Sequence, residues 1–154
     1  MGEKKIGVFL CQCGGNISKT IDLEQVAQFV ETREDIGIVK IHSNMCSGAG
    51  QKMIIEEAKE LGLNRIVIAS CSPHFHEKTF KGTMEKAGLN PFVLELVNFR
   101  EHCSWAHKDQ PEIATEKAKD LVNAGINKAR EDYELAKKKI KMGNRVLVIG
   151  GGIA

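Results

Sequence analysis

Four short apolar runs separate amphipathic segments in the first part of the chain. The runs are rich in Val, Ile, Leu and Phe, which are common in β-strands. The third run is almost entirely apolar, as is typical of a central parallel strand covered on both faces. The sequence therefore predicts four strands, at Lys5–Leu10, Ile36–His42, Arg65–Ser70 and Phe92–Val97.

Each predicted strand is followed by a segment that favours a helix. In the first of these segments Leu23, Val26, Ala27 and Val30 recur at the i, i+3, i+4, i+7 spacing of one buried helical face. Helix starts are indicated by capping residues, namely Asp22 with Gln25, Ser72 before Pro73, and Asp109 with Glu112. The four helices are expected from Asp22, from the loop after Cys46 to Gly62, from Ser72 to Gly88, and from Asp109 to about Lys141.

This alternation of strands and helices predicts an α/β fold. The spacing between strands leaves room for one helix each, and right-handed crossovers place helices on both faces of the sheet. We expect a four-stranded parallel sheet, flavodoxin-like or Rossmann-like, with a long C-terminal helix. The α/β domain is expected over residues 1–110 and the long helix or linker over residues 111–143.

All 5 cysteines lie at or shortly after the carboxyl ends of the predicted strands. In open parallel sheets, ligands bind in the crevice beyond these ends. Thiols that are far apart in the sequence are therefore expected to converge at one edge of the sheet. The sequence predicts a metal site there, with the candidate ligands Cys11, Cys13, Cys46, Cys71 and Cys103.

The spacing of the cysteines favours an iron–sulfur cluster over a structural zinc site. Zinc sites usually use pairs of cysteines two to four residues apart, and the C-x₂-C-x₂-C ferredoxin run is also missing. A [4Fe–4S] cube offers one iron atom to each of four thiolates from separate strand ends. Backbone N–H groups are expected to face it from the helix starts near Cys46 and Cys71 and from Gly14, Gly15, Gly48 and Gly50.

Other side chains near the thiols complete the expected site. Three histidines are candidate ligands, although histidines in such loops more often hydrogen-bond around a metal site than ligate it. These are His74, His76 and His102. Three aromatic residues are expected to shield the site from water, namely Phe75, Phe99 and Trp105.

Three other kinds of site fit some of the same residues. Cys11 and Cys13 would serve a thiol-redox or sulfur-transfer protein, although redox dithiols favour C-x-x-C spacing. A flavodoxin-like FMN site would use the same crevice, but the first turn is not a Ser/Thr-rich phosphate loop. The third alternative is a docking module, in which the thiols hold zinc or nothing and the Lys-rich helix contacts a partner.

Composition and charge exclude several classes of function. The 154 residues carry a formal net charge of +2, which is too small to favour nucleic acid or an anionic membrane as a partner. No apolar stretch approaches the roughly 20 residues that span a bilayer, and the N-terminus lacks a signal-peptide pattern. We expect a cytoplasmic protein, whose cysteines stay reduced and serve metal binding or catalysis.

The final residues, 144–154, are similar to the beginning of a dinucleotide-binding unit. An apolar run at 144–149 leads into Gly150, Gly151 and Gly152, and the chain stops before the third glycine of a G-x-G-x-x-G fingerprint. Without the helix that follows this motif, we do not expect it to bind FAD or NAD here. We interpret it as the truncated start of a Rossmann flavin-binding domain of a parent protein.

Blocks of sequence at 8–17, 69–80, 98–105 and 148–154 are similar to those of a known family. They contain VFLCQCGGNI, ASCSP followed by HEKTF, NFREHCSW and VIGGGIA. Together they closely resemble the N-terminal region of the heterodisulfide reductase A subunits, over essentially the whole chain.

This resemblance implies an iron–sulfur electron-transfer domain that is not catalytic alone. The parent would be a flavoprotein of an anaerobic archaeon or bacterium, as in methanogenesis, with FAD and several [4Fe–4S] clusters. It would act with other heterodisulfide reductase subunits and electron donors in flavin-based electron bifurcation, and a homodimer through the parent stays open. The resemblance also implies four cluster ligands: Cys46, Cys71, Cys103 and one of Cys11 and Cys13.

Overall fold

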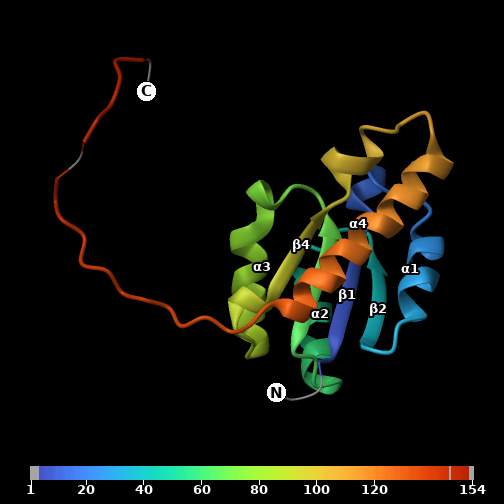
Figure 1. Ribbon diagram of the computed structural model, residues 1–154, viewed down its shortest axis with the longest axis horizontal. Helices are drawn as coiled ribbons and strands as arrows, with labels where there is room; N and C mark the ends of the chain where they lie inside the picture. The colour runs from blue at the N-terminus through green and yellow to red at the C-terminus, as the bar shows by residue number, and fades with distance from the viewer. Residues whose placement is uncertain (1–3, 146, 153–154) are drawn as a thin grey trace.

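The computed structural model describes residues 4–145 and 147–152 and confirms the α/β fold. Its four strands are all parallel and lie in the order β2-β1-β3-β4, which is the order of a flavodoxin-like sheet (Figure 1). The strands are β1 (Ile6–Cys11), β2 (Ile36–His42), β3 (Arg65–Ser70) and β4 (Leu94–Asn98).

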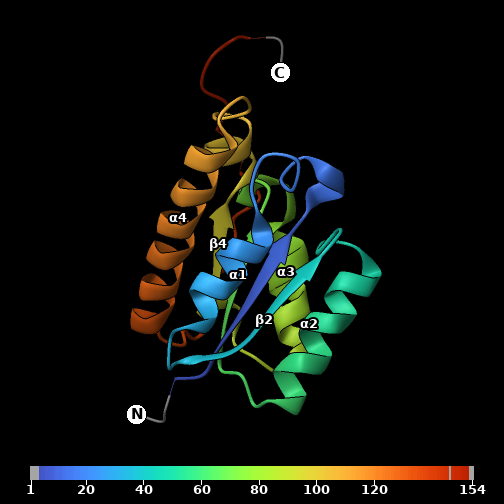
Figure 2. The ribbon, with the colours of Figure 1, turned by 90° about the vertical axis from the view of Figure 1, so that its right-hand side faces the viewer.

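Two helices cover each face of the sheet, with α1 beside α4 on one face and α2 beside α3 on the other (Figure 2). The helices are α1 (Leu23–Glu31), α2 (Gly48–Glu60), α3 (Pro73–Ala87) and α4 (Pro111–Glu131). Three short helical turns join them to strands: η1 (Cys13–Gly15), η2 (Pro91–Val93) and η3 (Arg100–Ser104). Within the described residues, no helix combines the length and apolarity needed to cross a membrane.

The central strand β1 divides the interior into two hydrophobic cores. Successive side chains of a strand point to opposite faces of the sheet. Val8 and Leu10 therefore pack in the core beneath α1 and α4, whereas Phe9 and Cys11 pack in the core beneath α2 and α3. The face of the sheet to which the Cys11 side chain points determines which other thiols can lie near it.

The carboxyl ends of the strands reach the same edge of the sheet. Cys11 at the end of β1 lies opposite His42 at the end of β2, and Ser70 of β3 lies opposite Asn98 of β4. The order of strands reverses between β1 and β3, because β1 connects to β2 on one side and β3 lies on the other. A ligand crevice is expected at this switch point.

Local sequence signals define the beginnings and ends of several helices. The Asp22 carboxylate accepts a hydrogen bond from the Gln25 backbone N–H at 3.0 Å, and Ser72 caps α3 in front of Pro73. Gly88 ends α3 with a φ of 84°, a left-handed conformation in which a side chain would be strained. These three predictions are confirmed.

The strand ends at β1 and β4 shift by one or two residues, and both ends of α4 also differ from the prediction. Strand β4 starts at Leu94, because Pro91 and the Asn90 cap fold the preceding residues into η2. The predicted capping box of Asp109 with Glu112 is wrong, since α4 starts at Pro111 and its N-cap, Gln110, makes no side-chain cap. Proline is well suited to that first helical position.

Helix α4 also ends earlier than predicted, at Glu131 rather than near Lys141. Its buried face, which includes Ala118, Val122 and Ile126, ends where the helix leaves the sheet. The Lys-rich residues beyond it are exposed, so a longer helix would gain no burial.

The described residues of 144–152 form no strand, and Gly150, Gly151 and Gly152 are exposed. Val146, Ile153 and Ala154 of the predicted nucleotide motif lie outside the described residues, as do residues 1–3.

An ion pair between Arg130 of α4 and Asp35, just before β2, ties this helix to the sheet. Hydrogen bonding from Arg130 holds the pKa of the Asp35 carboxyl below its ordinary value. Such a group stabilises the fold above its unfolded-state pKa, and that contribution is lost as the pH falls through the folded-state pKa. Asp35→Asn is therefore expected to lower the free energy of unfolding by about 1 kcal/mol at neutral pH and to have little effect in acid.

Urea unfolding of both proteins at about pH 7 and at about pH 2, well below an ordinary carboxyl pKa, checks this expectation. Glu34→Gln is the matched control, because Glu34 is the exposed neighbour of Asp35. An equal loss of stability from Asp35→Asn at both pH values would contradict the assigned role of the ion pair.

Candidate metal centre

Four of the five cysteines line one cavity of about 360 Å³ at the carboxyl edge of the sheet. These four, Cys11, Cys13, Cys46 and Cys71, are called the cavity cysteines below. They come from the ends of three strands, and Asn16, Asn44, Ser70, His76, Phe80 and Arg100 complete most of the lining. The cavity lies beside the switch point between β1 and β3, where the fold favours a ligand site.

The direction of the crossovers explains why these four thiols meet. Cys46 precedes α2 and Cys71 precedes α3, and both helices cover the face toward which Cys11 points. Cys13 follows two residues after Cys11 and packs against the cores of both faces. The cavity cysteines thus share one face as well as one edge of the sheet.

Cys11 is the buried centre of this group. Its sulfur accepts hydrogen bonds from the backbone N–H of Cys13 at 3.3 Å and of Met45 at 3.4 Å. Burial raises the pKa of the Cys11 thiol, the two N–H groups oppose this rise, and the neighbouring Cys13 and Cys46 sulfurs add to it. The backbone is thus arranged to stabilise a negative sulfur that burial alone would disfavour.

Cys13 has an unusual backbone conformation, with a φ of 53°. Among the described residues it is the only one other than glycine with a positive φ. A left-handed conformation costs an L-residue about 1 to 2 kcal/mol. Strain of this kind is often found at functional sites, and here it accompanies a thiol that lines the cavity.

Cys46 lies in the turn that leads into α2. Its carbonyl oxygen accepts a hydrogen bond from Gln51 Nε2 at 2.9 Å, and Gln51 Oε1 accepts one from Thr83 of α3 at 3.2 Å. Ser47 caps the helix by accepting from the Gly50 N–H at 3.1 Å. The helix start and the neighbouring helix therefore both fix the backbone that carries this thiol.

Cys71 follows β3 directly and is buried. Burial raises the pKa of its thiol to about 11, and the positive charge of Arg100 opposes this rise. The Cys13, Glu101 and Cys11 charges add to it. The charges of Cys13 and Cys11 thus act on the Cys71 thiol, as expected for three residues that line one cavity.

Cys103 lies elsewhere, although sequence reasoning grouped it with the others. Its side chain is 0% exposed in the core beneath α1 and α4, and its thiol donates to the Ala114 carbonyl at 3.1 Å. It does not line the cavity. The reason is topological, because β4 connects to α4 and so carries η3 toward the opposite face of the sheet.

Among the three candidate histidines, only His76 lines the cavity. The expected aromatic shield is also arranged differently: Phe99 is buried in the core beneath α1 and α4, whereas Phe75 and Trp105 are 65% and 54% exposed. Phe80 of α3, which is buried in the core beneath α2 and α3, supplies the apolar wall.

The N–H groups of Gly14, Gly15 and Gly50 donate to oxygen atoms rather than to the thiols. Gly14 N donates to the Ser43 carbonyl at 3.1 Å and Gly15 N to the Gln12 carbonyl at 3.0 Å. Both N–H groups therefore stabilise the turn itself. In the part of the chain that the structure describes, the donors to the cavity sulfurs are the Cys13 and Met45 N–H groups and the Arg100 guanidinium. The guanidinium Nη1 lies 3.3 Å from the Cys13 sulfur.

Sequence reasoning missed the role of Arg100. Arg100 lies three residues before Cys103 in the block NFREHCSW, and this position was the one signal in the sequence. The spacing alone does not indicate which cysteine the Arg100 side chain contacts.

The four thiols line one cavity without gathering at a single point. Within residues 4–145 and 147–152, no three His, Cys, Asp or Glu side chains are gathered closely enough to hold a single metal ion. Four thiols on one cavity of this volume suit a larger inorganic group with several metal atoms, such as a [4Fe–4S] cube.

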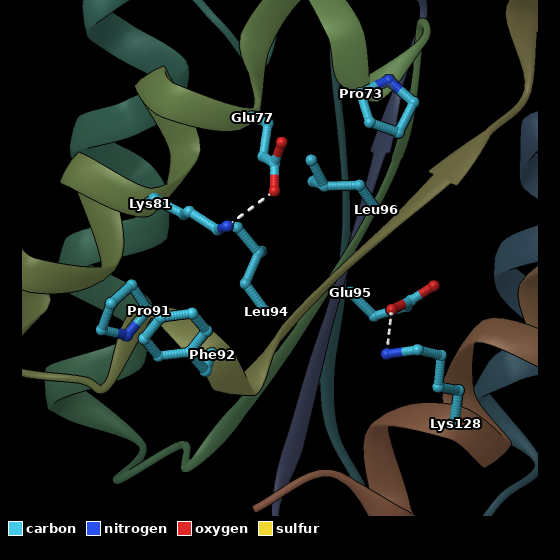
Figure 3. A pocket seen from close by; sticks show the side chains of 9 residues that line it. All are labelled: Pro73, Glu77, Lys81, Pro91, Phe92, Leu94, Glu95, Leu96 and Lys128. Carbon is cyan, nitrogen blue, oxygen red and sulfur yellow. Dashed lines mark hydrogen bonds and ion pairs between the residues drawn. The ribbon is translucent and has the colours of Figure 1, made fainter. Parts of the chain in front are cut away.

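A second cavity of about 360 Å³ lies along β4 between α3 and α4 (Figure 3). Its charged residues pair with each other, Lys81 with Glu77 at 2.6 Å and Lys128 with Glu95 at 2.8 Å. No cysteine or histidine lines it, so its residues offer none of the soft ligands of the first cavity.

Comparison with known proteins identifies relatives of the chain. It is 48% identical over 154 residues to the A subunit of the H(2):CoB-CoM heterodisulfide,ferredoxin reductase of Methanothermobacter marburgensis, covering 100% of this chain and 23% of that protein. It is 45% identical over 152 residues to the second iron-sulfur A subunit of the CoB–CoM heterodisulfide reductase of Methanopyrus kandleri, covering 99% and 23%. No protein-family model matches the chain.

A third relative agrees with these two. The A subunit of the ferredoxin/F(420)H(2)-dependent CoB-CoM heterodisulfide reductase of Methanosarcina acetivorans is 47% identical over 150 residues, covering 97% of this chain and 19% of that protein. The chain thus spans about a fifth of the length of these relatives. Identity at this level over nearly all of its residues shows that the chain is related to the A subunits of heterodisulfide reductases.

Proposed function

We propose that this chain is an iron–sulfur electron-transfer module in which the cavity cysteines hold one [4Fe–4S] cluster. The observation that carries the proposal is the convergence of Cys11, Cys13, Cys46 and Cys71 on one cavity. The relation to heterodisulfide reductase A subunits, one of which is named an iron-sulfur subunit, supports a redox role. Cys103 is left out of the ligand set, because it is bonded within the opposite core.

The residues around the thiols would hold the cluster and stabilise its charge. When bound, a [4Fe–4S] cluster supplies one-electron redox chemistry. The Cys13 and Met45 N–H groups donate to the Cys11 sulfur, and the N-termini of α2 and α3 lie beside Cys46 and Cys71. Partial positive charge at helix N-termini stabilises nearby thiolates. The buried Phe80 ring lines the cavity and limits the access of water to the thiols.

The raised pKa values of Cys11 and Cys71 favour metal binding over thiol catalysis. Nucleophilic cysteines have lowered pKa values, because the thiolate is the reactive form. A metal ligand is deprotonated by the metal itself, which releases the proton on binding. We therefore favour a metal-ligand role for Cys11 over a role as the nucleophile of a thiol-redox or sulfur-transfer protein.

We further propose that the module relays electrons inside a larger assembly. The relatives are about five times longer and are named as subunits of reductases that act on the CoB–CoM heterodisulfide. The partners proposed here are other subunits of this type and a flavin domain of the parent protein. The proposal places the bond chemistry at the heterodisulfide elsewhere in the assembly and assigns only electron transfer to this cavity.

Metal analysis of the chain after anaerobic reconstitution with iron and sulfide tests the proposal. The expected content is about four iron and four sulfide per chain, as a cube requires. Zinc binding without sulfide would support the docking-module alternative and contradict the cluster. Complete alkylation of all four cavity cysteines in a reconstituted sample would also contradict it, because ligating sulfurs are protected.

A further inference from the structure

Arg100 is the one cationic side chain that reaches the cysteine cavity, among the residues that the structure describes. Its Nη1 donates to the Cys13 sulfur at 3.3 Å. The side chain is only 16% exposed, so its charge acts through a partly desolvated environment.

Two aromatic rings and one carboxylate fix the guanidinium in place. Its central carbon lies 4.7 Å from the centre of the Trp105 ring and 5.3 Å from that of Phe75, within the range of cation–π contacts. Glu101 Oε1 accepts from Arg100 Nε at 3.1 Å and from Nη2 at 2.7 Å. The side chain is therefore pre-positioned before any ligand enters.

Glu101 also connects Arg100 to the loop of Cys71. Its second oxygen, Oε2, accepts a hydrogen bond from the Ser72 backbone N–H at 2.9 Å. Arg100 and Glu101 thus join the loop after β1, which carries Cys13, to the loop after β3, which carries Cys71. The pair spans the switch point of the sheet.

A π-helical turn makes this arrangement possible. In η3, Ser104 N donates to the Phe99 carbonyl at 2.8 Å and Trp105 N to the Arg100 carbonyl at 2.9 Å, each five residues back. This wide turn lets Arg100 reach the cavity while Cys103 is buried in the opposite core. Single π turns are frequently found at functional sites.

We propose that Arg100 is a positioning residue that holds the Cys13 thiolate and raises the reduction potential of the cluster. The inference rests on the proposed function. Reduction adds one electron to a site that already carries four thiolates. The Arg100–Glu101 ion pair turns its positive end toward Cys13, so it stabilises the reduced form more than the oxidised form. Hydrogen bonds to cluster sulfurs and local charge are known determinants of such potentials.

The test compares Arg100→Met, which removes the charge and the hydrogen bond, with Arg100→Lys, which keeps the charge. Each reconstituted 154-residue chain is titrated with reductant, and the fraction of reduced cluster is followed by EPR. At a fixed solution potential, Arg100→Met is expected to lower the ratio of reduced to oxidised cluster about tenfold, equivalent to ~59 mV for one electron. Arg100→Lys is expected to stay close to the wild-type ratio.

Lys59→Met is the matched control, because Lys59 is an exposed residue of the last turn of α2 and its loss changes the net charge equally. It is expected to leave the potential unchanged. An Arg100→Met chain that binds iron normally and titrates like wild type overturns the inference.

A second variant covers the case in which Arg100→Met binds too little iron to titrate. Arg100→Gln keeps a donor for the Cys13 sulfur without the charge, and a lowered potential in that variant supports the inference. If both neutral variants lose iron while Arg100→Lys keeps it, the charge is needed to hold the thiolates, as proposed. Failure of the proposed function is distinct, because the wild-type chain itself would then hold no cluster.

Discussion

A serine substitution at any one of the four cavity cysteines is expected to remove most of the bound iron, whereas Cys103→Ser leaves the iron content close to that of the wild type. A cluster that loses one thiolate ligand has an open iron, and ligand loss of this kind sharply lowers metal affinity. We expect no such role for Cys103, because its thiol donates to the Ala114 carbonyl in the core beneath α1 and α4.

Iron and sulfide analysis of the five reconstituted variants measures this difference. Cys103→Ser keeps a donor for the Ala114 carbonyl and is expected to lower the free energy of unfolding by about 1 kcal/mol, since it places a hydroxyl in an apolar core. Urea unfolding without metal shows whether each variant folds. Loss of iron in a well-folded Cys103→Ser chain, with full iron in Cys13→Ser, would refute the ligand set.

The proposed ligand set includes both Cys11 and Cys13, between which sequence reasoning left the choice open. The strand ends could be read from the apolar runs, so the edge of the sheet to which the thiols belong was predictable. The face was not, because it depends on the direction of the crossover that follows each strand. Cys46 and Cys71 lead into helices of one face, and Cys103 leads toward α4 on the other.

Gly50→Ala is expected to disturb both the fold and the site. A Cβ at this position would lie 2.6 Å from the Met45 carbonyl oxygen and 2.7 Å from the Asn44 carbonyl oxygen. Both atoms belong to the backbone of the turn that carries Cys46, so the turn must shift. Overpacking of this kind costs about 1 to 3 kcal/mol, and the displaced Cys46 is expected to hold iron poorly.

The matched control is Gly48→Ala, two residues earlier in the same helical turn. A Cβ there meets no atom within 4 Å, so this variant is expected to retain its iron. Its stability is expected to stay equal or to rise by up to about 1 kcal/mol, because alanine restricts the unfolded chain. Thermal unfolding and iron content of the two variants provide the comparison. Equal behaviour of Gly48→Ala and Gly50→Ala would show that close packing at Gly50 does not position Cys46.

The other departures from the sequence prediction also have physical causes. The Lys-rich residues after Glu131 have good helix propensity, but they lack an apolar face that could pack on the sheet, so α4 stops there. Arg100 was missed because cation–π contacts with Phe75 and Trp105 depend on tertiary positions that no spacing reveals. Capping at Asp22, Ser72 and Gly88 was predictable, because it depends on neighbouring residues alone.

The central claim is that thiols from three strand ends together hold one redox-active cluster. The most direct measurement is a low-temperature EPR spectrum of the anaerobically reconstituted wild-type chain after reduction. We expect the signal of a reduced [4Fe–4S] cluster, at about one spin per chain, which disappears on reoxidation. A reconstituted chain that binds iron yet gives no such signal after reduction, or that binds no sulfide, would contradict it.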